Sequence, residues 1–377
     1  MNKSAHSLAI GGLLAMASAV GIGRFVYTPI LPPMVEALHL SKSQAGLIAS
    51  ANFIGYLAGA LLAAVKLPGT HRAWLLIAMA ANVLCLGGMG LTTDMAAFLA
   101  LRAVAGFASA FGLIFASALV LNRLQASGHG TLSAVHFAGV GTGIAAASAL
   151  VAWLAFHGGD WRGMWFASAA LALAASIAVA ILVPPDARTA VAPAGPKTRL
   201  SRGFWFLLVA YGLFGFGYII TATFIVQMVR GSPQIAALEP YIFILFGLSA
   251  APSVAFWTWL ARRSTILRTF ALACATEAVG VAASALFLSP ATVILTSVFV
   301  GGTFMGLTAL GLLGAREGGG DPRGRIALMT ASFSFGQILG PLFAGHVYDL
   351  TNSLAVPSLA AAAALLIAAA LSLRRPT

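Results

Sequence analysis

Long apolar runs, separated by short polar breaks, divide this sequence into segments of similar length. A helix needs about 20 predominantly apolar residues to cross a bilayer, and twelve runs reach or approach that length. They cover residues 8–34, 45–65, 74–91, 95–121, 132–156, 161–183, 203–229, 238–260, 266–288, 290–315, 326–348 and 353–373. The pattern therefore predicts an all-α membrane protein with twelve transmembrane helices.

One stretch interrupts this pattern. Residues 184–202 are polar, basic and rich in proline, a composition typical of a linker. The stretch leaves six predicted spans on each side. We therefore expect an N-terminal six-helix bundle (1–183), a cytoplasmic linker (184–202) and a C-terminal six-helix bundle (203–377).

A weak internal repeat relates the two halves. The Gly-x-Gly at 21–23 recurs at 215–217, and the Met-Val at 34–35 recurs at 228–229, an offset of 194 residues in both cases. Repeats of about half the chain are common in secondary transporters. The repeat favours two pseudo-symmetric bundles.

The composition agrees with a membrane location. Hydrophobic residues make up 60% of the chain and charged residues 8%, whereas a soluble domain is usually about 25% charged. The mean hydropathy is +0.96. The only two cysteines, Cys85 and Cys274, fall within predicted spans, so we interpret them as small buried apolar residues that do not indicate the redox compartment.

The net charge of +12 first suggests a nucleic-acid partner, but the positions of the charges exclude it. If the N-terminus is cytoplasmic, sixteen of the 21 basic residues lie in inner loops and termini, and three lie in outer loops. This asymmetry is the positive-inside rule. It predicts a multi-pass membrane protein with an even number of spans and both termini cytoplasmic.

Two basic residues, Arg24 and Arg102, fall inside predicted spans. A guanidinium in the bilayer costs at least about 2.5 kcal/mol, so it must face protein or a water-filled cavity, and such residues are usually functional. We interpret the pair as an anion-binding site or a coupling switch. The competing interpretation is that carboxylates or backbone carbonyls neutralise them, with Asp94 as the preferred partner of Arg102.

Small residues recur at positions where helices could approach closely. Gly55, Gly59 and Ala63 are spaced by four in the second span, which places them on one helix face. The glycines of the fifth span at 139–143 and the segment 336–341 predict close-packed seams between the halves. No strand precedes them, so they are not phosphate-binding loops.

Four segments resemble one branch of a transporter superfamily. They are GIGRFVYTPILP at 21–32, NFIGYLAGA at 52–60, HFAGVGTGI at 136–144 and GQILGP at 336–341. With the twelve spans, the linker and the half-length repeat, the whole chain resembles the major facilitator superfamily, and these segments resemble its YbfB/YjiJ-like branch. The arginine four residues before a glycine, Arg102 to Gly106, is similar to the superfamily's fourth-span motif.

The resemblance implies a transporter in which the first and fourth helices line a central cavity, with Arg102 in substrate handling or proton coupling. Uncharged polar residues on the helices expected to border that cavity are further candidates for substrate contacts. Each could equally hold helices together. The candidate substrate-binding residues are Arg24, Arg102, Tyr27, Asn52, Tyr56, Tyr218, Gln227 and Gln337.

Three residues are candidates for proton coupling. Glu277 is the clearest carboxylate in the middle of a span, although its helix, the ninth, is peripheral in the superfamily and a purely structural role is as plausible. Asp94 lies nearer the outer surface. His136 is of the residue type that titrates near neutral pH, but a single histidine near a helix end is more often structural.

These observations favour a secondary transporter of a small organic solute, with proton-coupled export by alternating access and an anionic substrate. The alternatives are broad efflux of apolar or cationic compounds, and a membrane sensor or scaffold that does not transport. No metal spacing or catalytic constellation is present, so we expect no enzyme, no metal and no cofactor. The expected partners are the substrate, protons and the lipid bilayer, with the protein as a monomer.

Overall fold

The helices of the computed structural model follow the apolar runs. The structure describes residues 4–65, 67–185, 200–317 and 322–374, and the regular elements in these ranges are all helical. In the first half of the chain the elements are α1 (Ala5–Met16), η1 (Ala17–Ile22), α2 (Gly23–Phe25), α3 (Tyr27–Leu38), α4 (Lys42–Ala63), α5 (His71–Leu91), α6 (Met95–Ala126), η2 (Gly130–Leu132), α7 (Ser133–Phe156) and α8 (Trp161–Leu182). In the second half they are α9 (Arg202–Arg230), η3 (Ala236–Leu238), α10 (Glu239–Ala250), α11 (Ser253–Arg263), α12 (Ile266–Leu286), α13 (Pro290–Glu317), α14 (Pro322–Thr351) and α15 (Ala355–Ser372).

Among the described residues, eleven helices are long and apolar enough to cross a membrane, or twelve if the bent pair α10 and α11 forms one span. The predicted fold class, an all-α multi-pass membrane protein, is confirmed. The helices of the pair meet at an angle of 42°, whereas the sequence predicts one span over 238–260 and gives no break in it. Pro252 lies at the break; it has no N–H to donate, and its ring disfavours a continuous helix.

The first span is longer than predicted. The sequence places Pro32 and Pro33 near its outer end, but the helical segment continues to Leu38 and ends at His39, whose φ of 51° closes the helix in a left-handed conformation. Pro32 is buried. Prolines are tolerated inside membrane helices where neighbouring groups satisfy the freed backbone, so they do not end this helix.

The chain forms two compact units. Unit 1 comprises Met1–Leu40, Ala51–Ala190 and Phe243–Pro252, and unit 2 comprises Ser41–Ser50, Val191–Ile242 and Ser253–Thr377. Each unit therefore takes one short piece from the other half of the sequence. Most of the predicted linker 184–202, residues 186–199, lies outside the described residues.

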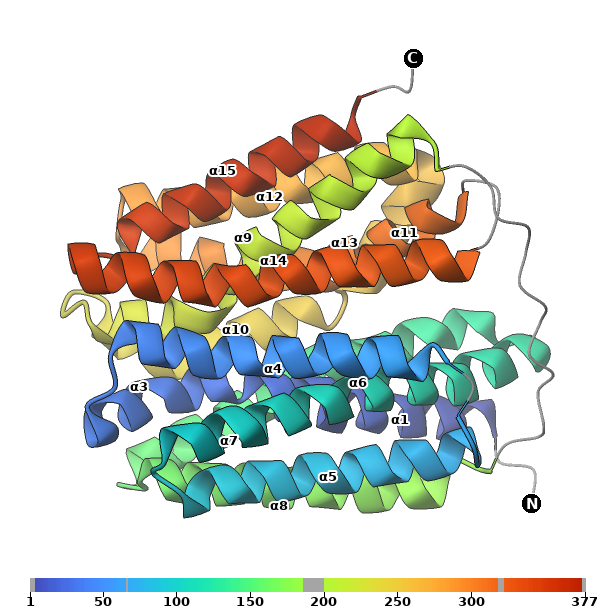
Figure 1. Ribbon diagram of the computed structural model, residues 1–377, viewed down its shortest axis with the longest axis horizontal. Helices are drawn as coiled ribbons and strands as arrows, with labels where there is room; N and C mark the ends of the chain where they lie inside the picture. Colours follow the sequence, from blue (N-terminus) through green and yellow to red (C-terminus); the bar gives the residue numbers. More distant parts are fainter. Residues whose placement is uncertain (1–3, 66, 186–199, 318–321, 375–377) are drawn as a thin grey trace. The chain divides into compact units, whose positions relative to one another are not determined.

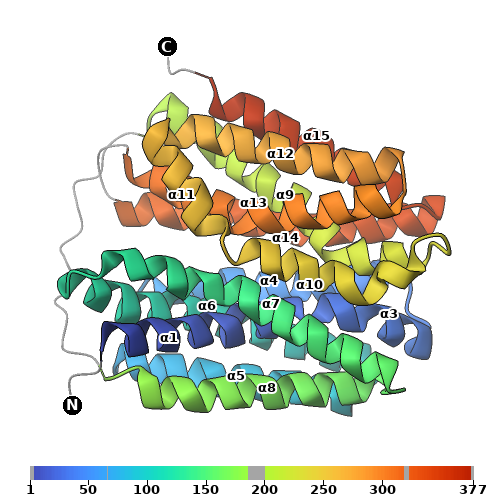
Figure 2. The same ribbon diagram turned by 180° about the vertical axis from the view of Figure 1, so that it is seen from behind.

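Within unit 1, α5 packs against α6 and α8, and α1 packs against α7. Figures 1 and 2 show α5 and α8 side by side. Within unit 2, α9 packs against α14 and α15, while α12 packs against α13 and α15. The start of α4 is attached to α14, because the Asp349 carboxylate accepts hydrogen bonds from the N–H groups of Lys42 (3.1 Å) and Ser43 (3.0 Å). The Asp349 carboxylate thus caps the start of α4.

The small residues predicted to allow close packing in the second span do so. A Cβ added at Gly55 would strike the carbonyl of Ala103, and one added at Gly106 would strike the carbonyl of Asn52. Helices α4 and α6 therefore meet backbone to backbone, as small residues permit in membrane proteins.

The fifth-span glycines only partly match their prediction as a seam between the halves. Gly139 and Gly143 pack on the backbone of Leu13 and Ala17 in the first span, which belongs to the same half of the sequence. Gly141 alone among these three meets the other half of the sequence, at Gly247 and Ala250 of α10 and at Ala251, which follows that helix. Similarly, Gly336 and Gly340 pack on α9, within their own half. These glycines mainly bring helices of one half together.

Candidate functional site

Arg24 lies where the first span is least regular. The π-helical turn η1 ends at Ile22, the short α2 carries Arg24, and α3 begins only at Tyr27. Single π-helical turns within α-helices are frequent at functional sites. The Arg24 side chain is only 6% exposed, so a full charge is held inside unit 1.

The surroundings of Arg24 are aromatic. Its guanidinium carbon lies 4.6 Å from the ring centroid of Phe53 and 4.6 Å from that of Tyr56, both on α4, and 5.6 Å from Phe25. Cation–π contacts of this kind stabilise a desolvated cation by about 2 kcal/mol. The rings cover the faces of the guanidinium, and the Tyr56 hydroxyl also forms a hydrogen bond with the Arg24 side chain.

The edge of the guanidinium is unused. Among the described residues, neither Nε nor Nη2 of Arg24 has a hydrogen-bond partner, although both atoms are buried. The Nε–H bond and one Nη2–H bond point in the same direction, and this edge can take a carboxylate through two parallel hydrogen bonds. Arg24 therefore presents an unoccupied anion-binding edge.

Arg102 is different, because both of its terminal nitrogens are engaged and only its Nε has no partner among the described residues. Its Nη1 donates to the carbonyl of Gly23 (3.4 Å) and its Nη2 to the carbonyl of Arg24 (3.2 Å), and its guanidinium carbon lies 5.0 Å from the ring centroid of Tyr27. The side chain is 2% exposed. Arg102 thus fastens α6 to the segment that carries Arg24.

The preference for Asp94 as the partner of Arg102 was wrong. The Asp94 carboxylate accepts a hydrogen bond from the N–H of Ala97 (2.8 Å) and caps the start of α6. Neither Arg24 nor Arg102 forms an ion pair with a carboxylate in the part of the chain that the structure describes. An exposed aspartate at a helix start is better stabilised by the local N–H groups than by a side chain two turns away.

Two buried asparagines form hydrogen bonds to backbone carbonyls near the arginines. The Asn52 amide donates to the carbonyl of Arg102 (3.0 Å), so this predicted substrate contact joins α4 to α6. The Asn82 amide donates to the carbonyl of Ser18 in η1 (3.1 Å). Sequence reasoning missed Asn82, although an asparagine in the middle of an apolar run is a signal of its own.

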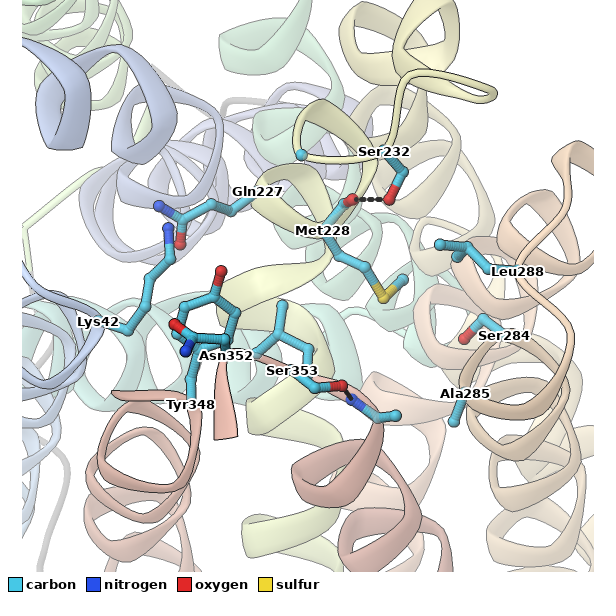
Figure 3. Close-up of a pocket in the computed structure, with 13 residues that line it drawn as sticks. Lys42, Gln227, Met228, Ser232, Ser284, Ala285, Leu288, Tyr348, Asn352 and Ser353 are labelled. Carbon is cyan, nitrogen blue, oxygen red and sulfur yellow. Dashed lines mark hydrogen bonds between the residues drawn. The ribbon is translucent and has the colours of Figure 1, made fainter. Parts of the chain in front are cut away.

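The candidates of unit 2 form a separate group. The Gln337 amide donates to the Tyr218 hydroxyl, and the Tyr218 ring stacks on Phe304 and Phe333, with centroids 5.6 and 5.8 Å apart. These residues therefore join α9, α13 and α14. Gln227 lies near the end of α9, is 8% exposed and lines a pocket of unit 2 (Figure 3).

Glu277 is fully buried on α12 and contacts α13. The Thr303 hydroxyl donates to its Oε2 over 2.7 Å, and the other carboxyl oxygen, Oε1, has no partner among the described residues. The same hydroxyl lies 2.7 Å from the carbonyl oxygen of Phe299. A hydroxyl has one proton to donate, so it can serve the carboxylate or the backbone, but not both.

His136 is also buried, and its Nε2 lies 3.1 Å from the Ser117 hydroxyl on α6. It therefore joins α7 to α6, which favours the structural role. Within the residues that the structure describes, no three His, Cys, Asp or Glu side chains come together as metal ligands would.

Solved structures with the same fold are transporters. The nucleoside transporter NupG superposes with a TM-score of 0.72 at 16% identity over 100% of both chains, and a mutant of it with 0.73 at 17% identity over 98% of this chain and 96% of that one. A bacterial homologue of the human lysosomal transporter Spinster, inward-facing and unoccupied, superposes with 0.72 at 15% identity, covering 99% and 97%. These likenesses show that the chain has the same fold as these transporters.

The sequence places the chain more narrowly. Residues 16–373 match the family described as the uncharacterised MFS-type transporter YbfB. The chain belongs to this family, as the motifs at 21–32 and 136–144 predicted. A comparison with curated proteins finds no match.

Proposed function

We propose that this transporter exports a small organic anion across a bacterial inner membrane, coupled to protons, by alternating access. In this proposal residues 1–183 and 203–377 act as the two moving bundles, the termini are cytoplasmic and the protein works as a monomer. The observation that carries the choice of an anion is the unused edge of Arg24.

The arrangement around Arg24 supports a carboxylate as the bound group, rather than an anion of a single atom. Phe53 and Tyr56 hold the guanidinium plane, and the free Nε and Nη2 form the fork that fits the two oxygens of a carboxylate. Both atoms are closed to solvent here, so a substrate reaches them only when the surrounding helices part. Alternating access supplies such a step.

Broad efflux of apolar or cationic compounds is less well supported. A cation would need an acidic group near the aromatic residues, and Arg24 has no carboxylate partner among the described residues. A sensor or scaffold that does not transport would have no use for an unpaired buried charge, which is costly to keep.

Glu277 is the best-supported proton carrier of the three candidates. When the carboxyl is charged, the Thr303 hydroxyl can donate to it; when the carboxyl is protonated, the hydroxyl is free to donate to the Phe299 carbonyl. The Thr303 hydroxyl therefore has an acceptor in both protonation states of the Glu277 carboxyl. Asp94 and His136 are already engaged in capping and in packing.

The test of the proposal begins with metabolite profiling of cells with and without the protein. Compounds that change are then offered to sealed vesicles containing the purified protein, under an imposed pH gradient. We expect a carboxylate-bearing compound to move with the gradient. Transport restricted to apolar or cationic compounds, or no transport of any compound in the profile, would contradict it.

Replacement of Glu277 by glutamine is expected to uncouple transport. Glutamine keeps the size and can still accept from Thr303, but it cannot carry a proton, so accumulation driven by a pH gradient should be lost while exchange of substrate for substrate continues. Exchange and gradient-driven uptake are measured in the same vesicles. Thr303→Ser, which keeps the hydroxyl, is the control and should behave as wild type; unchanged gradient-driven uptake by Glu277→Gln would remove Glu277 from the coupling step.

A further inference from the structure

Helices α11 and α13 of unit 2 pack against each other (Figures 1 and 2), and one serine of α11 bonds to the backbone of α13. Ser253 is the first residue of α11 and follows Pro252 at the break after α10. Its hydroxyl donates to the carbonyl of Gly302 (2.8 Å) and accepts from the N–H of Gly306 (2.9 Å), both on α13. The Ser253 side chain is 2% exposed, so water has little access to these bonds.

The two groups that Ser253 contacts are partners in a regular helix. The N–H of Gly306 and the carbonyl of Gly302 lie four residues apart, the spacing of a bond in the α-helical ladder. The Gly302 carbonyl also accepts from the indole N–H of Trp257 (2.7 Å). A carbonyl oxygen has two lone pairs, so two side chains of α11 use its acceptor capacity. A side chain inserted in the ladder is a known cause of helix bending, and α13 can therefore bend at the turn formed by residues 302–306.

Glycine makes the 302–306 turn depend further on α11. A glycine lowers helix stability by about 1 kcal/mol relative to alanine, and both ends of this turn are glycines. A Cβ added at Gly306 would strike the side chain of Trp257, so the glycine leaves the room that Trp257 needs. The turn is thus held by contacts with α11 as well as by its own ladder.

Thr303 connects this turn to the Glu277 carboxyl. It follows Gly302 directly, and its hydroxyl lies 2.7 Å from Oε2 of Glu277 on α12 and 2.7 Å from the carbonyl oxygen of Phe299, one turn earlier on α13. A threonine hydroxyl that donates to the carbonyl four residues earlier often bends its helix. The acceptor that Thr303 uses therefore affects the bending of α13, and the 302–306 turn can take up the change.

Phe304 connects the same turn to two residues predicted to contact the substrate. Its ring stacks on that of Tyr218 on α9, with centroids 5.6 Å apart and planes 9° apart. The Tyr218 hydroxyl in turn accepts a hydrogen bond from the Gln337 amide. Because Phe304 lies inside the turn, a bend there displaces its ring relative to Tyr218. The turn thus joins the proposed proton carrier to these two residues through direct contacts.

We propose that the 302–306 turn of α13 is a hinge that Ser253 holds and that Glu277 controls through Thr303. While the Glu277 carboxylate accepts from Thr303, the hinge is at rest; when the carboxyl is protonated, Thr303 donates to the Phe299 carbonyl and α13 bends. Ser253 is a positioning residue, because it acts through the backbone of α13. The use of the hinge in transport rests on the proposed role of Glu277 in proton coupling, whereas the hinge itself is tested without substrate.

The test is hydrogen–deuterium exchange of the backbone amides in the 302–306 turn, measured by mass spectrometry on the full-length protein in detergent. Ser253→Ala removes the inserted hydroxyl, so the Gly306 N–H pairs with the Gly302 carbonyl within α13. We expect exchange in this turn to slow at least about threefold, as one further net hydrogen bond in a helix does.

Ser332→Ala is the matched control. The Ser332 hydroxyl on α14 donates to the carbonyl of Leu208 on α9, in the same unit, and accepts from no backbone N–H among the described residues. The control removes a serine hydroxyl that joins two helices without entering a ladder. It should leave exchange in the 302–306 turn as in the wild type.

Glu277→Leu tests the control of the hinge by the carboxyl. It removes both carboxyl oxygens, so the Thr303 hydroxyl keeps only backbone acceptors, and we expect the turn to exchange at least about threefold faster. This acceleration should vanish when Glu277→Leu is combined with Thr303→Val, which keeps the shape without the hydroxyl. It should also vanish in combination with Ser253→Ala, whereas a serine that only adds stability would leave it unchanged.

Three results would overturn the hinge. They are exchange in Ser253→Ala that is as fast as in the wild type or faster, no acceleration in Glu277→Leu, and the same acceleration with and without the Ser253 hydroxyl. The Tm of each variant shows whether it is folded; if Ser253→Ala is not, Ser253→Cys, which keeps the size and bonds more weakly, takes its place with the same expected direction. Coupled transport by Glu277→Gln would remove Glu277 from proton coupling and leave the exchange results as they are, so the two proposals fail separately.

Discussion

Replacing Arg24 with glutamine is expected to abolish transport while the protein stays folded and becomes at least as stable as the wild type. The substitution removes a buried charge with two unpaired donors, so the folded state no longer bears its desolvation cost. The same substitution removes the fork for the substrate carboxylate. Loss of a buried charged partner costs about 2–5 kcal/mol of binding free energy, at least about 30-fold in affinity.

Arg102→Gln is the matched control, because it removes the other buried arginine of the same unit. Its guanidinium satisfies the carbonyls of Gly23 and Arg24, and leaving them unpaired should cost about 1–3 kcal/mol each. We therefore expect the Tm to fall in Arg102→Gln and to stay or rise in Arg24→Gln. Substrate affinity and Tm are measured on both purified variants.

Two results would contradict this division of roles. If Arg24→Gln transported at the wild-type rate, Arg24 would not bind the substrate. If Arg24→Gln lowered the Tm as much as Arg102→Gln, both arginines would be structural. Arg24→Lys adds a geometric check, since an ammonium keeps the charge but lacks the fork, and we expect it to restore binding only in part.

Replacing Gly106 with alanine is expected to have the largest effect on the fold. The added Cβ would strike the carbonyl of Asn52 on α4, and backbone cannot rotate away as a side chain can. Overpacking costs about 1–3 kcal/mol even where side chains adjust, so we expect at least this loss, seen as a lower Tm and a smaller yield of monodisperse protein.

Gly87 provides the control for this substitution. It is a helical glycine of the same unit, and a Cβ added to it meets nothing within 4 Å. Gly87→Ala should therefore be neutral or stabilise by about 0.4–1 kcal/mol, through the lower entropy of the unfolded chain. Equal Tm values for the two variants would show that α4 and α6 do not depend on this close approach.

The spacing of Arg102 and Gly106 has a physical explanation in these contacts. Gly106 lies one turn after Arg102, and it admits the backbone of α4 at Asn52. The Asn52 amide then reaches the carbonyl of Arg102. The glycine thus positions α4, and with it Phe53 and Tyr56, whose rings enclose Arg24.

The sequence alone determined the number and approximate bounds of the membrane helices, the family, and the presence of two arginines inside the membrane, because hydrophobic run length and charge position are properties of the chain itself. It also predicted the close approach of another helix at Gly55. These features depend on local composition or on residues spaced along one helix.

Only the tertiary structure decided which arginine has both terminal nitrogens bonded to the backbone. Arg24 and Arg102 look equivalent in the sequence, but the carbonyls that engage Arg102 belong to Gly23 and Arg24, in the irregular segment of η1 and α2, and no local pattern predicts where those carbonyls point. The same holds for Asp94, which caps its own helix. Partners far apart in sequence are brought together by helix packing, and helix packing is what the pattern of apolar runs leaves undetermined.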